Sequence, residues 1–130
     1  MIKENPIDNF EVLVEKCAAS EAGARVLGMY DHTIQFSLLD GDPFFFTAIG
    51  GKVEVSAGEM PSTNLDNGYE IKGSTDNFVE WFQGQSRMSD LIENGQLFPV
   101  ASHTTKRHID YWVAQIVRIG NGIKIPKEVY

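Results

Sequence analysis

Cysteine is almost absent from this 130-residue sequence, in which Cys17 is the sole example. An intrachain disulfide is therefore excluded. Cys17 follows Phe10, Leu13 and Val14 at helical spacing, which predicts a buried structural thiol rather than a nucleophile. The sequence also lacks an apolar run long enough to cross a bilayer, and its first residues show no signal-peptide pattern. We expect a cytoplasmic protein without stable membrane insertion.

Positive charge is scarce as well. The 18 acidic residues outnumber the 11 Lys and Arg, so that the formal net charge is −7. An acidic protein is repelled by nucleic-acid phosphates and by anionic membranes, and we therefore expect no nucleic-acid partner. Lys106, Arg107 and His108 form the only basic cluster in the sequence, at the expected start of the last helix.

Motifs that signal catalysis are missing too. There is no glycine-rich phosphate loop and no serine flanked by glycines. His103 and His108 are five residues apart, a spacing that does not place both on one helix face, and no cysteine pair completes a zinc set. We predict no catalytic residue, no metal site and no cofactor. The alternative is a small α+β isomerase or hydratase that uses Asp31, His32 or Tyr111.

Helical periodicity occurs at both ends of the chain and in its second half. Asp8, with Glu11 three residues later, predicts the start of a first helix. Capping residues and glycines mark the boundaries of the other helices, and apolar residues at helical spacing between these boundaries support each predicted helix. The expected helices are one after Ser20 that stops at Gly28, one from Ser74 to Gly84, a short one over Met88–Ile92, and one over 106–119.

Apolar patterns between turn residues predict five strands, at 33–38, 44–49, 52–56, 69–72 and 97–101. The first alternates cleanly and reads as half-buried, whereas Phe44–Ile49 is apolar on both faces. A turn with Gly41 and Pro43, and then Gly50-Gly51, join the first three strands into an antiparallel meander. Pro99 demotes the fifth strand to an edge. We predict one α+β domain, with an N-terminal helical segment at 8–28, a core at 32–119 and a tail at 120–130.

Ordered segments of this chain resemble the sterol carrier protein 2 family of lipid-binding domains, across roughly Ile34 to Ile116. The segments that carry the resemblance are Gly51–Val55, Tyr69–Phe78, Gln83–Gln85, Met88–Ile92 and Gly95–Val100. The resemblance implies a five-stranded, mainly antiparallel sheet with helices packed on one face. It also implies a hydrophobic tunnel between the two layers, lined by Phe36, Phe46, Phe78, Trp81, Phe82, Met88, Leu91, Trp112 and Ile116.

The function that this resemblance implies is binding and transfer of a sterol, a fatty acid or a fatty-acyl-CoA, without enzymatic activity. A charged head group would lie at the tunnel mouth, where Lys106 and Arg107 are candidates. Periodicity by itself favours a packed core over a cavity for the same apolar residues. A third interpretation is a dimerising interaction module without a ligand, in which an exposed patch around Trp112 forms a homodimer interface.

Overall fold

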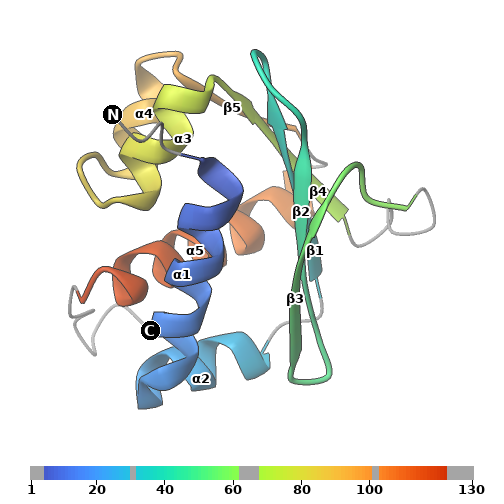
Figure 1. The fold of residues 1–130 in the computed structure, drawn as a ribbon, viewed down its shortest axis with the longest axis vertical. Helices are drawn as coiled ribbons and strands as arrows, with labels where there is room; N and C mark the ends of the chain where they lie inside the picture. Colours follow the sequence, from blue (N-terminus) through green and yellow to red (C-terminus); the bar gives the residue numbers. More distant parts are fainter. Residues whose placement is uncertain (1–4, 30–31, 62–67, 101–102, 123–130) are drawn as a thin grey trace.

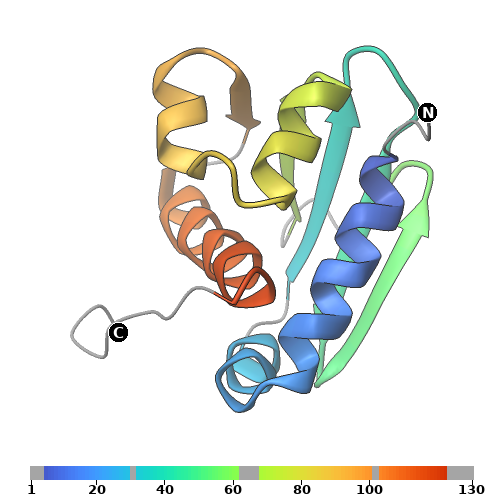
Figure 2. The ribbon, with the colours of Figure 1, turned by 60° about the vertical axis from the view of Figure 1, so that its left-hand side comes forward.

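The computed structural model describes residues 5–29, 32–61, 68–100 and 103–122, and the side chains of 103–111 lie outside this description. The chain folds into one sheet with helices on one of its faces, as Figure 1 and Figure 2 show from two directions. This arrangement confirms the predicted α+β architecture with its helices on one side.

The N-terminal helical segment consists of two helices. Helix α1 (Pro6–Ala19) begins before the predicted Asp8, because the Asn5 side chain accepts a hydrogen bond from Ile7 N and Pro6 suits the first helical turn. The prediction of Asp8 as the cap is therefore wrong. Ser20 caps helix α2 (Glu21–Met29), as predicted, by accepting from Gly23 N at 2.9 Å. Gly28 does not stop α2, which ends at Met29.

The strands are β1 (His32–Leu38), β2 (Phe44–Ile49), β3 (Lys52–Ala57), β4 (Gly68–Gly73) and β5 (Leu97–Val100), in the sheet order β3-β2-β1-β4-β5. The meander of β1, β2 and β3 is confirmed, as is the edge position of the strand that contains Pro99. Strand β4 pairs with β1 in parallel, and the other pairs are antiparallel. The sheet is therefore mixed, with β1 at its centre.

The central strand is buried on both faces, so the prediction of a half-buried β1 is wrong. Ile34 and Phe36 face the helices, while Thr33 and Gln35 on the opposite face are only 2% and 9% exposed. Gln35 Oε1 accepts a hydrogen bond at 2.8 Å from Met60 N, in the segment that follows β3. The segment at Met60, 25 residues further along the chain, thus covers Gln35 on the face of β1 that the alternating pattern predicted to be exposed to solvent.

The second half of the chain supplies the remaining helices, α3 (Thr75–Phe82), α4 (Met88–Glu93) and α5 (His103–Gly120). Ser74 caps α3 as predicted, accepting from Asn77 N at 3.2 Å, and Gly84 follows α3 with a φ of +75°. Helix α5 begins three residues before the predicted 106 and includes Gly120, which was assigned to the tail. Residues 123–130 of that tail lie outside the described residues.

Candidate functional site

The predicted tunnel residues all lie in the interior between the sheet and the helices. Each is at most 5% exposed. They come from β1, β2, α3, α4 and α5, and they are Phe36, Phe46, Phe78, Trp81, Phe82, Met88, Leu91, Trp112 and Ile116. The fold thus brings together side chains that are up to 80 positions apart in the sequence, from Phe36 to Ile116.

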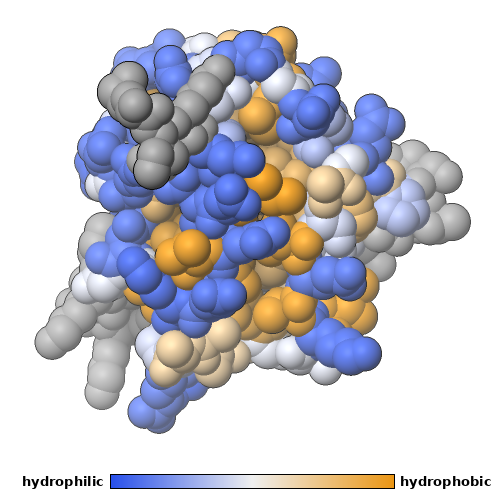
Figure 3. Space-filling model, in the orientation of Figure 1, coloured by the Kyte–Doolittle hydropathy of each residue, from blue (hydrophilic) through white to orange (hydrophobic). Residues whose placement is uncertain are grey.

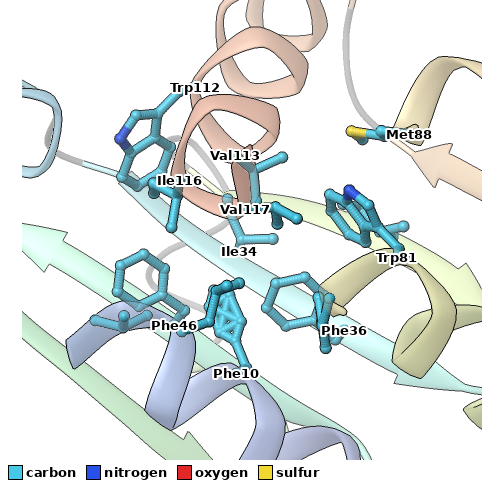
Figure 4. Close-up of a cluster of buried hydrophobic side chains, with 14 of the residues drawn as sticks. Phe10, Ile34, Phe36, Phe46, Trp81, Met88, Trp112, Val113, Ile116 and Val117 are labelled. Atoms are coloured by element: carbon cyan, nitrogen blue, oxygen red, sulfur yellow. The ribbon is translucent and has the colours of Figure 1, made fainter. Parts of the chain in front are cut away.

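The aromatic residues among these side chains form two clusters, called the first and the second aromatic group below. In the first, the ring centroid of Phe36 lies 5.4 Å from that of Phe82 and 5.7 Å from that of Phe78, both edge to face. In the second, Phe46 stacks on Trp112 at 5.8 Å. The ring centroid of Trp81 lies 6.3 Å from that of Phe36, so Trp81 belongs to the first group. Figure 4 shows Ile34, Val113 and Val117 between Trp81 and Trp112 of the second group.

Phe10 of α1 joins the two groups, a role that sequence reasoning missed. Its ring centroid lies 4.9 Å from that of Phe36, 5.0 Å from that of Phe82 and 5.2 Å from that of Phe46. The signal was present, because Phe10 heads the apolar face of the first helix. Among the described residues, these rings therefore pack against one another across the interior between the layers.

A surface hollow of about 700 Å³ lies where α1 begins, next to the turn between β1 and β2 and the start of α3. We refer to it as the larger hollow, because a second hollow, described below, is smaller. Phe44 lines the larger hollow, and its ring stacks on that of Phe36 at 4.8 Å, so the hollow borders the first aromatic group. Its other apolar lining residues are Pro6, Ile7, Leu38, Pro43 and Ala57, and its acidic ones are Asp40, Asp42 and Asp76. Figure 3 shows apolar surface on this side of the molecule, between α1 and the β3 edge.

A smaller hollow, of about 370 Å³, lies at the opposite end of α3. Phe82 lines it, together with Val12 and Leu13 of α1 and Gly120 at the end of α5. Its polar lining residues are Asp8, Asn9, Lys16, Gln83 and Asn121. The two hollows therefore flank α3, the helix that carries Phe78, Trp81 and Phe82.

Hydrogen bonds hold α3 at both ends. Asp40 Oδ1 accepts from Thr75 N at 2.8 Å and from Thr75 Oγ1 at 2.9 Å at its start. At its end, Asn121 Nδ2 donates to the carbonyl oxygens of Phe82 at 2.9 Å and of Val117 at 2.8 Å. The position of the aromatic residues on α3 thus depends on residues of the β1–β2 turn and of the chain after α5.

Of the three residues considered for catalysis, Asp31, His32 and Tyr111, only His32 has a described side chain. His32, at the start of β1, is partly buried with its ring centroid 5.6 Å from that of Trp112. Asp31 and the side chain of Tyr111 lie outside the described residues. So do the side chains of His103 and His108, considered as metal ligands, and those of Lys106 and Arg107, considered for a head group. Within the described part of the chain, no three His, Cys, Asp or Glu side chains gather as a metal site would require.

Two further expectations concern the surface. Trp112 is fully buried within the single chain, so the expected exposed Trp112 patch is contradicted. A homodimer formed by another surface stays a prediction. No helix in the described ranges has the length and hydrophobicity needed to cross a membrane.

The fold is shared with several solved structures, although neither a protein-family model nor a curated protein sequence matches the chain. Sterol carrier protein domain 2 of Helicoverpa armigera has a TM-score of 0.66 at 14% identity, covering 97% of this chain and 99% of that one. The apo form of sterol carrier protein 2 from Yarrowia lipolytica has a TM-score of 0.62 at 15% identity, with coverages of 92% and 96%. UbiJ-SCP2, a ubiquinone synthesis protein, has a TM-score of 0.64 at 10% identity, with coverages of 85% and 90%. This chain has the fold of the sterol carrier protein 2 domains.

Proposed function

We propose that this protein binds an apolar ligand between its sheet and its helices and transfers it, acting as a carrier rather than as an enzyme. The ligand classes are those implied by the sequence resemblance: a sterol, a fatty acid or a fatty-acyl-CoA. The observation that carries the proposal is the apolar interior built from five elements, in a fold shared with proteins described as sterol carriers.

The driving force is the removal of ligand surface from water. Each 100 Å² of apolar surface that the ligand buries contributes roughly 2.5 kcal/mol. The larger hollow, at about 700 Å³, falls within the range of roughly 300–1,000 Å³ that is typical of small-molecule sites. An apolar chain can therefore bind usefully with few polar contacts.

Ligand binding requires the interior side chains to part, and this requires α3 and α4 to shift against the hydrogen bonds that hold α3 at both ends. Their eight and six residues make helices that are marginal without packing, and α4 has no side-chain cap at its start. They carry Phe78, Trp81, Phe82, Met88 and Leu91. An outward shift of these two helices would open the space above β1, and the larger hollow at the start of α3 would be its mouth.

The first experiment asks whether the protein carries a lipid at all. The purified protein is extracted with organic solvent for mass spectrometry, and a fluorescent fatty acid is then displaced by unlabelled sterol, fatty acid or fatty-acyl-CoA. We expect lipid in the extract, or saturable probe binding that at least one of these ligands displaces. A protein without lipid and without probe binding would contradict the proposal.

The second experiment locates the mouth with a pair of variants on one strand. Ala57 is exposed and lines the larger hollow, whereas Glu54 is exposed on the opposite face of β3. We expect Ala57→Trp to fill the hollow and weaken probe binding about tenfold or more, a loss of ~1.4 kcal/mol. Glu54→Trp adds the same bulk away from the hollow and should leave the affinity unchanged. Equal affinities for both variants would remove the larger hollow from the proposed route.

A further inference from the structure

Tyr69 places a hydroxyl group without a partner in the apolar interior. The residue lies on β4 and is 1% exposed. Its Oη atom is buried, and no described group forms a hydrogen bond with it. Leaving a buried hydroxyl unsatisfied lowers the stability of the folded protein, because the group gives up its hydrogen bonds to water on folding. Such an atom in a native protein calls for a physical reason.

The side chain of Tyr69 belongs to the helix-facing layer of the sheet. In the parallel pair of β1 and β4, Tyr69 is the partner of Ile34, whose other neighbour is Phe46 on β2. Phe46 stacks on Trp112 of α5, and α5 also packs over β4. The Tyr69 side chain thus lies on the same face of the sheet as the second aromatic group, which is the face that the proposed ligand would occupy.

The larger hollow lies further along the same central strand. Leu38 lines that hollow and is four residues beyond Ile34 on β1. Four residues of strand span about 13 Å, at roughly 3.3 Å per residue. A ligand that extended from the hollow along the helix-facing side of β1 would pass Phe36 and reach Tyr69 with its inner end.

We infer that the Tyr69 hydroxyl is the hydrogen-bond anchor for one neutral oxygen atom of the ligand, a hydroxyl or a carbonyl, bound with this oxygen inward and its apolar body toward the larger hollow. This inference rests on the proposed function and narrows it to neutral lipids. A Tyr hydroxyl can donate to a carbonyl and can either donate to or accept from an alcohol.

Electrostatics disfavours an anionic head group at the outer end of this path. At the outer end, the larger hollow is lined by Asp40, Asp42 and Asp76, and none of its described lining residues is Lys, Arg or His. A fatty acid or a fatty-acyl-CoA would be repelled there, whereas a neutral lipid would not.

The test compares 1-dodecanol with dodecane, two ligands that share a chain and differ in one hydroxyl. Both are measured by displacement of a neutral fluorescent probe from the wild-type protein and from Tyr69→Phe. We expect the substitution to weaken 1-dodecanol binding about tenfold and to leave dodecane binding unchanged. Unliganded Tyr69→Phe should be at least as stable to urea as the wild type, because the variant lacks the unsatisfied hydroxyl.

Thr33→Val is the matched control. It also removes a buried hydroxyl from a strand, but Thr33 faces away from the helices and its Oγ1 atom lies 3.2 Å from Thr47 Oγ1 as a hydrogen-bond partner. We expect this variant to lose stability while its affinity for 1-dodecanol stays that of the wild type. An equal loss of 1-dodecanol affinity in both variants would overturn the anchoring role of Tyr69.

A measurement on the wild-type chain makes the test independent of any variant. With ¹³C-labelled tyrosine, the Cζ resonance of Tyr69 should shift when 1-dodecanol binds and should not shift with dodecane. If both ligands bind and neither the resonance nor the Tyr69→Phe affinities discriminate between them, the inference is wrong and the proposed function stands. If the wild type binds neither ligand and no probe, both are overturned.

Discussion

At the scale of single residues, burial decides what the only thiol in the sequence can do. Cys17 lies on the core-facing side of α1 and is fully buried, as the helical spacing predicts. Desolvation raises the pKa of its thiol from 9.0 to about 11, because the apolar surroundings disfavour the thiolate. Cys17 therefore stays protonated near neutral pH and acts as a small apolar side chain.

This raised pKa predicts how stability depends on pH. The pKa of Cys17 is higher in the folded state than in the unfolded state, so its contribution is fully present below pH 9 and is lost as the pH rises through about 11. We expect the free energy of unfolding of the wild type to fall by on the order of 2–3 kcal/mol more than that of Cys17→Ala across this window. Urea titrations of both proteins at intervals from pH 8 to pH 11 measure the difference. Parallel curves would show that the thiol does not titrate as burial predicts.

At the scale of elements, α1 and α5 approach each other closely at Gly120. A Cβ atom at this position would lie 2.5 Å from Leu13 Cδ1 and 2.7 Å from the backbone oxygen of Leu13, and the backbone cannot rotate away as a side chain can. The absence of a side chain at Gly120 thus lets α5 pack directly on α1, which carries Phe10 into the centre of the interior. Leu13 and Gly120 also line the smaller hollow.

A pair of glycine substitutions tests this helix contact. We expect Gly120→Ala to destabilise the protein by about 1–3 kcal/mol, because the added methyl group pushes α5 away from α1. Gly28→Ala is the control, since Gly28 is an exposed residue of α2 whose Cβ would meet no atom within 4 Å. The control should leave stability unchanged or raise it by up to about 1 kcal/mol, because alanine favours helix. Urea unfolding separates the two outcomes, and equal effects would contradict a tight α1–α5 contact.

Most element positions could be predicted because local chemistry determines them. The strand at 44–49 and the Ser74 cap follow from a short apolar run between two turns and from a side chain that caps its own helix. The burial of Gln35 could not be predicted, because its hydrogen-bond partner, Met60 N, is 25 residues away in the sequence. The start of α1 was misplaced because Asp8 is an equally good capping residue by type, and the choice of Asn5 depends on the adjacent Pro6.

For the candidate site, too, the sequence predicts some features and not others. Helical and strand periodicity predict that side chains such as Trp81 and Trp112 point inward, and both are buried. Periodicity cannot predict how far two inward-pointing rings stand apart, since the space between them depends on ångström-level packing against other elements. Val113 and Val117 occupy the region between the two tryptophans (Figure 4), and Phe10 bridges their groups from a helix at the other end of the chain. The unpartnered hydroxyl of Tyr69 likewise emerges only once β4 lies beside β1.

At the scale of the whole molecule, charge governs how a carrier of this kind meets a membrane. The formal net charge is −7, and three carboxylates line the larger hollow through which we propose that the ligand passes. An anionic bilayer repels such a surface, and the repulsion is strong only where the Debye length is long. The protein should therefore deliver its ligand most readily to uncharged membranes.

Transfer of a neutral fluorescent lipid from the loaded protein to vesicles measures this effect. We expect transfer to phosphatidylcholine vesicles to be severalfold faster than transfer to vesicles that also contain phosphatidylserine, at about 0.01 M salt. At about 1 M salt the Debye length shrinks to about 3 Å, and the two rates should converge. Faster transfer to the anionic vesicles at low salt would mean that a basic surface docks on the membrane, and Lys106 and Arg107 would then be the residues to neutralise. The direction of this salt dependence thus decides whether the mouth lies at the acidic hollow or at the start of α5.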